Sequence, residues 1–392
     1  QVFQKIIEDL DFAIQWLPEA GSEEANRLNK DIARHVKARF CLNEGTHYKY
    51  HDELEYASEA EKWLQMAATE SDKLITSGRY EIYNTGHPQE DYFNMYRIDD
   101  KSDLKEAVLY VDYKTNIREH NMAAAGREAG CGFSKSFVES FLCSDGLPIS
   151  LSNKYLGDET MRKETANRDP RLKQLILTND FPTNVTDDLK DSTFVVNEDE
   201  FITQHCFTGY RPIKGFNPIY SQALYMKSSF DGIAYRYAET LLINAEAKAE
   251  LNTITNADLD RTVNQLRDRV GMPHLTVNVG FTDPKWPDWG YSLSPVLQEI
   301  RRERCIELAG EGFRFNDLKR WKAGKLLNNV LTYVGKRKPD GNLAIVYPNY
   351  TNPDLSYQAG KSRTWEDKMY LYPIPTGELQ RNPQLLPQNP GW

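Results

Sequence analysis

Two tryptophans in a proline-rich loop are the residues best suited to hold a ligand. The segment FTDPKWPDWGY, residues 281–291, places Trp286 and Trp289 three positions apart, with Asp288 between them and Tyr291 two positions later. Flat aromatic faces stack on the apolar C–H face of a sugar ring, and nearby carboxylates and amides bond the sugar hydroxyls. We expect these four side chains to contact a sugar ligand. The alternative is a loop that packs on a helical core.

A second group of aromatic and polar side chains lies in QHCFTGYRPIKGFNPIY, residues 204–220. It combines rings that could stack on a ligand with groups that could hydrogen-bond to it. The candidates are Phe207, Tyr210, Arg211, Phe216, Asn217 and Tyr220. A third and weaker cluster consists of Tyr48, Tyr50 and His51.

Signatures of catalysis and metal binding are weak. Glu299, Glu303, Glu307 and Glu311 could suggest glycoside hydrolysis, which needs two carboxyl groups facing a cleft about 5–9 Å apart. Arginines alternate with these glutamates at helical spacing, so we expect ion pairs along one helix face. The sequence has no G-x-S-x-G, H-E-x-x-H, P-loop or EF-hand pattern. We therefore expect no catalytic residues, no metal ligands and no cofactor, and leave a structural calcium ion open.

The five cysteines are Cys41, Cys131, Cys143, Cys206 and Cys305, and none forms a C-x-x-C motif. Their odd number excludes complete pairing, and no histidine lies at zinc-like spacing. A disulfide between Cys131 and Cys143 is one alternative. We expect buried free thiols.

Composition narrows the classes of partner. The chain has 392 residues, with 48 Lys+Arg against 57 Asp+Glu and a net charge of −9. Nucleic-acid binding requires an excess of clustered basic residues, so we exclude nucleic acid as a partner. The net negative charge suits a binder of neutral sugars. No apolar run approaches the ~20 residues of a membrane helix. Aromatic residues reach 11%, and the 40% of hydrophobic residues can support a large core.

Periodicity predicts a mainly α protein with an irregular middle. Apolar residues at three- and four-residue steps predict helices over 6–17, 31–43 and 56–77, ending at Pro18, Gly45 and Gly78 respectively. Further helices are predicted over 235–251, 257–270, 293–308 and 313–323. Between residues 80 and 228 only short strand-like runs stand out, over 107–112, 172–178 and 192–196. Small residues at helix crossings, such as Ala245 and Ala249, suggest tetratricopeptide-like hairpins with an irregular repeat.

Three segments point to one family: YRYAETLLINAEAKAEL (235–251), EIRRERCIELAGEGFRFNDLKRW (299–321) and YLYPIPTGELQRNPQLLPQNPGW (370–392). Together, in this order, they resemble the SusD/RagB family of surface nutrient-binding lipoproteins of the Bacteroidetes. Weaker pieces such as ARFCLNEG, RDPRL and NQLRDRVGMP extend the resemblance over essentially the whole chain.

The resemblance implies a single SusD-like domain over 1–392, with tetratricopeptide-like helical hairpins packed against a loop-rich part that has short strands. Hairpins would occupy 1–79 and 229–324, the loop-rich part 80–228, and an irregular C-terminal wrap 325–392. The signal peptide, the lipid anchor and the first helical pair of the family are expected to be missing. The family's EIRRERCIEL motif is architectural, so we expect a buried Arg304, ion-paired with Glu307, Glu311 or Asp317.

The function that the resemblance implies is non-enzymatic capture of an oligosaccharide or polysaccharide at the cell surface. The partner would be a SusC-like TonB-dependent transporter, and the membrane would be reached only through a lipid anchor in the outer membrane. Three alternatives stay open. They are peptide uptake as in RagB-like members, a glycan-degrading enzyme, and a helical-repeat scaffold whose aromatic loops merely pack.

Overall fold

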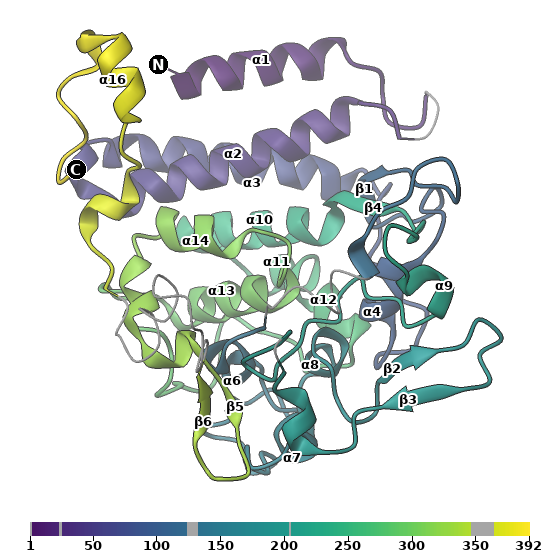
Figure 1. Ribbon diagram of the computed structural model, residues 1–392. Coiled ribbons are helices and arrows are strands. Elements are labelled where there is room, and N and C mark those ends of the chain that lie inside the picture. Colours follow the sequence, from purple (N-terminus) through teal and green to yellow (C-terminus); the bar gives the residue numbers. More distant parts are fainter. Residues whose placement is uncertain (1, 23–25, 124–131, 204, 346–363) are drawn as a thin grey trace.

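The structure is a computed structural model that describes residues 2–22, 26–123, 132–203, 205–345 and 364–392. Helices dominate it, as the periodicity predicted, and the described strands are short and paired only in twos. Figure 1 shows a stack of long helices over a half built of loops, short helices and two-stranded ribbons.

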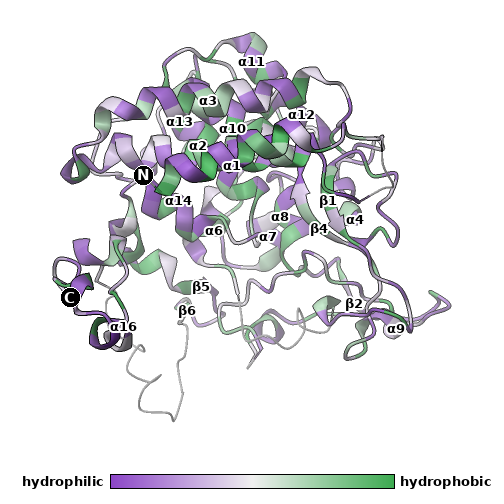
Figure 2. Ribbon diagram, turned by 90° about the horizontal axis from the view of Figure 1, so that it is seen from above, coloured by the Kyte–Doolittle hydropathy of each residue, from purple (hydrophilic) through white to green (hydrophobic). Residues whose placement is uncertain are grey.

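The helices of this stack, long and short, come from the two expected hairpin regions. They are α1 (Val2–Trp16), α2 (Lys30–Tyr50), α3 (Ala57–Thr76), α10 (Tyr237–Glu250), α11 (Asn256–Asp260), α12 (Val263–Arg269), α13 (Pro295–Glu307) and α14 (Arg314–Arg320). In Figure 1 α1 is outermost, α2 and α3 lie beneath it, α10 follows, and α13 is deepest. Figure 2 shows hydrophobic and hydrophilic residues alternating along these helices, as expected when one side of each is buried.

Helix α2 continues seven residues beyond its predicted end, so the stop predicted at Gly45 is wrong. A Cβ on Gly45 would lie 2.9 Å from Cγ of Leu64 and 3.0 Å from its backbone nitrogen. The glycine therefore marks the close crossing of α2 and α3. From the sequence alone, a glycine inside a helix cannot be distinguished from a glycine that ends a helix.

The irregular half has its own core and contains the remaining short elements. They are α4 (Asp91–Arg97), α6 (Lys135–Ser140), α7 (Met161–Thr165), α8 (Arg171–Leu175), α9 (Tyr220–Ala223), and the antiparallel pairs β1 (Ala107–Val111) with β4 (Gly232–Arg236) and β2 (Pro182–Val185) with β3 (Ser192–Phe194). The strand predicted over 172–178 is wrong, because its first part is α8. Leu172, Leu175 and Ile176 are all buried, and periodicity alone does not separate strand from helix in such a short, mostly buried run.

The C-terminal part begins with the 3₁₀ helices η3 (Gly324–Asn328) and η4 (Val330–Thr332) and the pair β5 (Val334–Arg337) with β6 (Leu343–Ile345). Later come η5 (Asp367–Tyr370), α16 (Thr376–Arg381) and η6 (Pro383–Leu385); two further 3₁₀ helices, η1 (Asp52–Leu54) and η2 (Glu198–Phe201), lie earlier in the chain. Tyr370 is buried, and its hydroxyl accepts a hydrogen bond of 2.8 Å from the amide of Gly324. This contact ties the start of the tail to η3.

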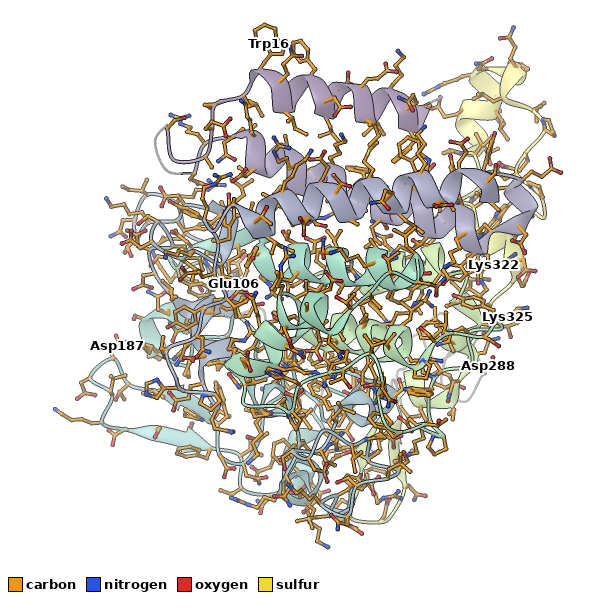
Figure 3. All side chains as sticks on the ribbon, turned by 180° about the vertical axis from the view of Figure 1, so that it is seen from behind. Trp16, Glu106, Asp187, Asp288, Lys322 and Lys325 are labelled. Atoms are coloured by element: carbon orange, nitrogen blue, oxygen red, sulfur yellow. The ribbon has the colours of Figure 1, made fainter. Side chains whose placement is uncertain are left out.

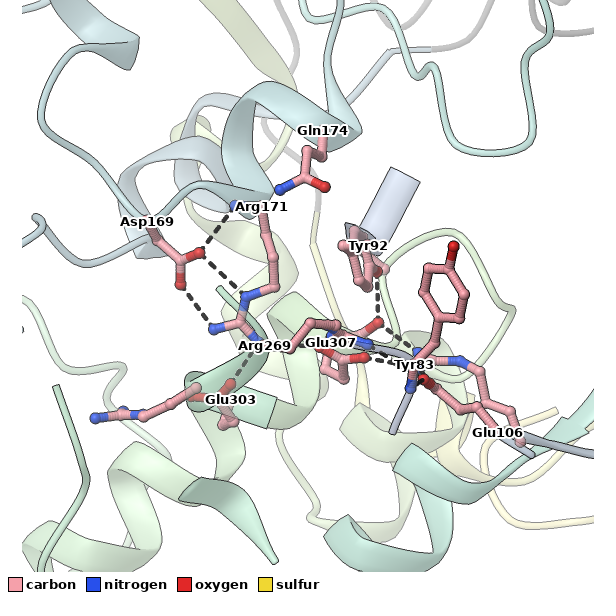
Figure 4. Close-up of polar contacts among 12 residues, drawn as sticks. Tyr83, Tyr92, Glu106, Asp169, Arg171, Gln174, Arg269, Glu303 and Glu307 are labelled. Carbon is pink, nitrogen blue, oxygen red and sulfur yellow. Dashed lines mark hydrogen bonds and ion pairs between the residues drawn. The ribbon is translucent and has the colours of Figure 1, made fainter. Parts of the chain in front are cut away.

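A buried network of charges joins α13 to the irregular half. The carboxylate of Glu307 accepts hydrogen bonds from Arg171 at 3.0 Å, Arg236 at 2.7 Å and Arg269 at 2.6 Å, and all four side chains are essentially inaccessible. Figure 4 shows Glu307 with Arg269, Arg171 and the neighbouring Tyr92. Burial alone would raise the pKa of Glu307, but the arginines outweigh it and hold the pKa well below its usual range.

The expectation of ion pairs along one helix face is therefore wrong for Glu303 and Glu307. Their partners come from other elements, Arg171 from α8 and Arg269 from α12, and they lie inside the protein. Arg304 behaves as predicted. It is buried, and its Nε donates to both oxygens of Asp317, at 3.1 and 3.0 Å, which ties α13 to α14.

Candidate ligand-binding cavity

A cavity of about 1020 Å³ lies where α13 meets the loop that contains the two tryptophans. Its described lining comes mainly from four stretches far apart in the sequence, 132–140, 283–289, 298–318 and 325–332. Ligand pockets in proteins are usually about 300–1000 Å³ and combine apolar walls with a few polar groups. The cavity is therefore large enough for a ligand of several sugar rings.

Trp286 lines the cavity with its ring only partly buried. Its Nε1 donates a hydrogen bond of 2.7 Å to the carboxylate of Glu299, which is itself fully buried on α13. Phe281 lies beside the ring, with the two centroids 6.0 Å apart. A partly exposed ring with a fixed orientation is what a stacking surface for a sugar requires.

Trp289 also lines the cavity, but most of its surface is used in packing. It is 5% exposed and its ring meets Trp321 edge to face at 5.5 Å. The guanidinium of Arg301 lies 4.7 Å from the ring centroid, and Nε1 donates to the side-chain oxygen of Gln298 at 2.6 Å. Trp289 thus forms part of the wall rather than an open face.

The other two candidates of the loop differ from each other. Asp288 is exposed, lines the cavity, and accepts a hydrogen bond of 2.9 Å from the amide of Gly290. Tyr291 is stacked on Tyr50 with centroids 4.4 Å apart, and its hydroxyl donates to the backbone carbonyl of Trp321. Burial raises the pKa of Tyr291 to about 12. Tyr50, from the third predicted cluster, is therefore a packing partner of this loop.

Three of the six residues of the second predicted group lie in the interior of the irregular half. Tyr210 is fully buried, with its hydroxyl 2.8 Å from the carboxylate of Glu164, and Phe216 is 5% exposed in the same hydrophobic cluster. Asn217 is also buried, and its side-chain oxygen accepts from the amide of Ile219 at 3.1 Å. These side chains lie in loops, yet they fill the interior because this half has few long helices to supply a core.

The remaining members of that group lie away from the large cavity. Arg211, with Phe216, lines a separate cavity of about 130 Å³ beside β2. Tyr220, at the start of α9, is 52% exposed, and Phe207 is partly buried. The described structure therefore does not bring the two predicted groups into one site.

Several aromatic side chains of the cavity have no place among the predicted contacts. Phe133 and Phe137 stack with centroids 4.4 Å apart on one wall, and Phe313 and Phe315 flank the start of α14 on another. Phe315 is 44% exposed. The only sequence signal for Phe313 and Phe315 is that they stand on either side of an arginine in GFRFNDLKRW. The helical pattern of that segment obscures this signal.

Most charged groups of the lining are paired. Arg302 donates to Asp283 at 2.6 Å, Arg304 to Asp317 at 3.0 Å, and Lys285 to Glu139 at 3.1 Å. In the glycosidase arrangement two carboxyl groups face the substrate, one of them protonated. Three of the four carboxylates in the described lining are instead held by cations, and the fourth is Asp288.

In the described part of the chain, no cluster of three or more His, Cys, Asp or Glu side chains has the arrangement of a metal site. Cys41 and Cys143 are buried free thiols, as predicted, Cys206 is also buried, and Cys305 is a partly buried free thiol on α13. Cys131, the other half of the alternative disulfide, lies outside the described residues. Across the described helices, none combines the length and apolar character needed to span a membrane.

Comparison with known proteins gives one consistent family. A sequence model of the SusD family matches residues 67–392. The SusD-like protein P2 of Formosa agariphila is 24% identical to this chain, over all of the chain and 65% of the relative. The chain thus spans just under two thirds of the length of that curated relative.

Solved structures agree on the fold. A SusD-like protein from Bacteroides fragilis is 25% identical, with a TM-score of 0.70 over 100% of this chain and 70% of its own. A SusD-like carbohydrate-binding protein from the same species is 22% identical, with a TM-score of 0.68 over 98% of this chain and 71% of its own. The mainly α, SusD-like architecture predicted from the sequence is confirmed.

Proposed function

The chain belongs to the SusD family, and from that membership we propose that it is a carbohydrate-binding protein without catalytic activity. Its ligand would be an oligosaccharide or polysaccharide held in the large cavity. The observation that carries the proposal is Trp286, a partly exposed ring at the cavity wall whose orientation is fixed by buried Glu299. The carbohydrate-binding relative from Bacteroides fragilis supports the same class of ligand.

The binding mode follows from the lining. The ring of Trp286 and the exposed ring of Phe315 offer apolar faces for sugar C–H groups. Asp288 and Asn329 line the same cavity and can hydrogen-bond to hydroxyl groups. Because the ion pairs behind these side chains are already formed, little side-chain ordering is needed on binding, which favours affinity.

We extend the proposal to the cellular role of the family. The protein would capture its glycan at the outer surface of the outer membrane and deliver it to a SusC-like TonB-dependent transporter. It would be held at the membrane by a lipid anchor rather than by a spanning helix. Co-purification with such a transporter from the native membrane tests this extension separately from ligand binding.

Isothermal titration against a panel of oligosaccharides tests the binding proposal. We expect W286A to weaken binding about tenfold, corresponding to about 1.4 kcal/mol of lost stacking. The matched control is W16A. Trp16 is 68% exposed on α1, pairs with Phe12 at 6.1 Å and is not part of the cavity lining (Figure 3). The proposal fails if no glycan binds, or if both variants bind as the parent protein does.

The same samples separate the alternatives. Release of reducing ends from any bound glycan would indicate an enzyme. Binding of peptides with no response to glycans would indicate RagB-like peptide uptake. Partner capture that is independent of W286A, with no small ligand at all, would indicate a scaffold.

A further inference from the structure

The cavity differs in charge from the protein as a whole. The chain carries a net charge of −9, yet the described lining has six basic side chains against four carboxylates. A site of the opposite sign to its protein attracts ligands that the rest of the surface repels, because walls of low dielectric constant focus the local field.

Two of these basic side chains have no carboxylate partner. Arg314 and Lys325 are exposed, line the cavity, and make no hydrogen bond or ion pair with any described residue. The guanidinium carbon of Arg314 lies 5.9 Å from the ring centroid of Trp321. By contrast, Arg304 is buried and the side chain of Arg302 is only 9% exposed, and both are bonded to carboxylates.

This difference distinguishes charges that stabilise the fold from charges that are available to bind a ligand. An arginine that is buried, or nearly so, needs its carboxylate for the fold to be stable, so the charges of Arg302 and Arg304 are explained by their ion pairs within the fold. No carboxylate of the described fold pairs with Arg314 or Lys325. The single unpaired carboxylate of the lining, Asp288, leaves the available charge positive. Lys325 and Asp288 lie at the same edge of the molecule in Figure 3.

From this arrangement we infer that the glycan held in the cavity is acidic, carrying carboxylate or sulfate groups. The inference rests on the proposed carbohydrate binding and adds the chemical class of the sugar. Arg314 stands between Phe313 and Phe315, which line the cavity with it. An aromatic face beside a free guanidinium suits a sugar ring that bears an acid group, because the ring stacks while the planar guanidinium bonds two acid oxygens.

The test uses matched glycan pairs that differ only in charge. One pair is oligogalacturonate and its methyl ester, and the other is a sulfated galactan oligosaccharide and its desulfated form. We expect one of the acidic members to bind at least about tenfold more tightly than its uncharged partner. Its affinity falls as sodium chloride rises from low to high concentration, because salt screens exposed charges.

Variants assign the preference to this cavity. The double variant R314Q/K325Q should weaken binding of the acidic glycan about tenfold or more, and D288N should strengthen it severalfold. The control is R118Q. Arg118 is exposed, lies 5.0 Å from the ring centroid of Tyr113, is not part of the lining and has no ion pair with a described residue, so it matches Arg314 in environment. It should change affinity less than twofold.

The outcomes distinguish this inference from the proposal beneath it. Equal or tighter binding of the uncharged partners overturns the acidic ligand but keeps carbohydrate binding. An acidic preference that R314Q/K325Q leaves intact overturns the role of these two side chains. Failure of every charged and uncharged glycan to bind overturns the proposed function itself.

Discussion

Glu307→Gln tests whether the buried charge network stabilises the fold. The change keeps the size of the side chain but removes the negative charge shared by Arg171, Arg236 and Arg269. Removing one partner of a buried ion pair leaves an uncompensated charge and lowers the free energy of unfolding by about 3–5 kcal/mol. We expect a loss of about 4 kcal/mol.

One of the three arginines should lose most of its stabilising partners in this variant. Arg171 keeps Asp169 at 2.7 Å, and Arg236 keeps Glu106 at 2.8 Å. Arg269 keeps only Glu106 at 3.5 Å, and its Nε and Nη1 have no hydrogen-bond partner in the described structure. After the substitution Arg269 is therefore the cation with the weakest compensation.

Thermal unfolding measures the effect. An unfolding entropy of about 2.1 cal/mol/K per residue gives about 0.8 kcal/mol/K for 392 residues, so 4 kcal/mol lowers Tm by about 5 °C. The control is E81Q, which removes an exposed pair with Lys105 of 2.9 Å. It should lower the free energy of unfolding by less than about 1 kcal/mol.

The double variant E307Q/R269M tests whether the uncompensated charge of Arg269 causes the loss of stability. Methionine removes the stranded cation at similar length, so the double variant should be more stable than E307Q alone. If E307Q unfolds at the parent temperature, or if R269M destabilises it further, the network does not stabilise the fold in the way described.

Three further predictions use the same unfolding assay. Gly45→Leu should lower Tm by about 4 °C, because a side chain there meets Leu64 at the α2–α3 crossing and overpacking costs about 3 kcal/mol; an unchanged Tm would mean that the helices separate freely. Trp289→Ala should destabilise by about 3–5 kcal/mol, in contrast to W286A, since Trp289 is 5% exposed; equal losses in the two variants would contradict the division of roles. Burial alone would raise the pKa of Glu239, but its buried partner His35, with a 2.9 Å contact, helps hold that pKa at about 2, below the ordinary 4.5. The stabilisation of the fold by this carboxylate is therefore present above pH 4.5 and is lost as pH falls towards 2. E239Q should show a weaker decrease in stability over this pH range, and a pH profile identical to that of the parent protein would refute the assignment.

Periodicity predicted the long helices well because each buries one face against a neighbour. The helix expected over 56–77 lies at Ala57–Thr76, and the one over 293–308 lies at Pro295–Glu307. The predictions fail where tertiary contacts determine the secondary structure. Gly45 lies inside α2, where α3 comes close, and residues 171–175 form a helix in which every residue except Lys173 is buried.

The candidate site was only partly predictable. The loop with two tryptophans was identifiable from its residue types, but its irregular backbone gives no period that shows which ring faces outward. That depends on Glu299 and Gln298, which bind the two indole nitrogens from α13. Phe133 and Phe315 reach the cavity from segments far apart in the sequence, and no local pattern brings such segments together.

The charged helix α13 links stability to binding. Its C-terminal part is anchored by Glu303 and Glu307, whose arginine partners come from α8 and α12. Its N-terminal part holds the tryptophan loop through Glu299, which bonds Trp286, and through Arg302, which bonds Asp283. The resemblance to the family implies that this helix is architectural, and the buried network agrees with that. The same rigidity fixes the ring of Trp286 at the cavity wall, so the helix that stabilises the fold also orients the proposed stacking surface.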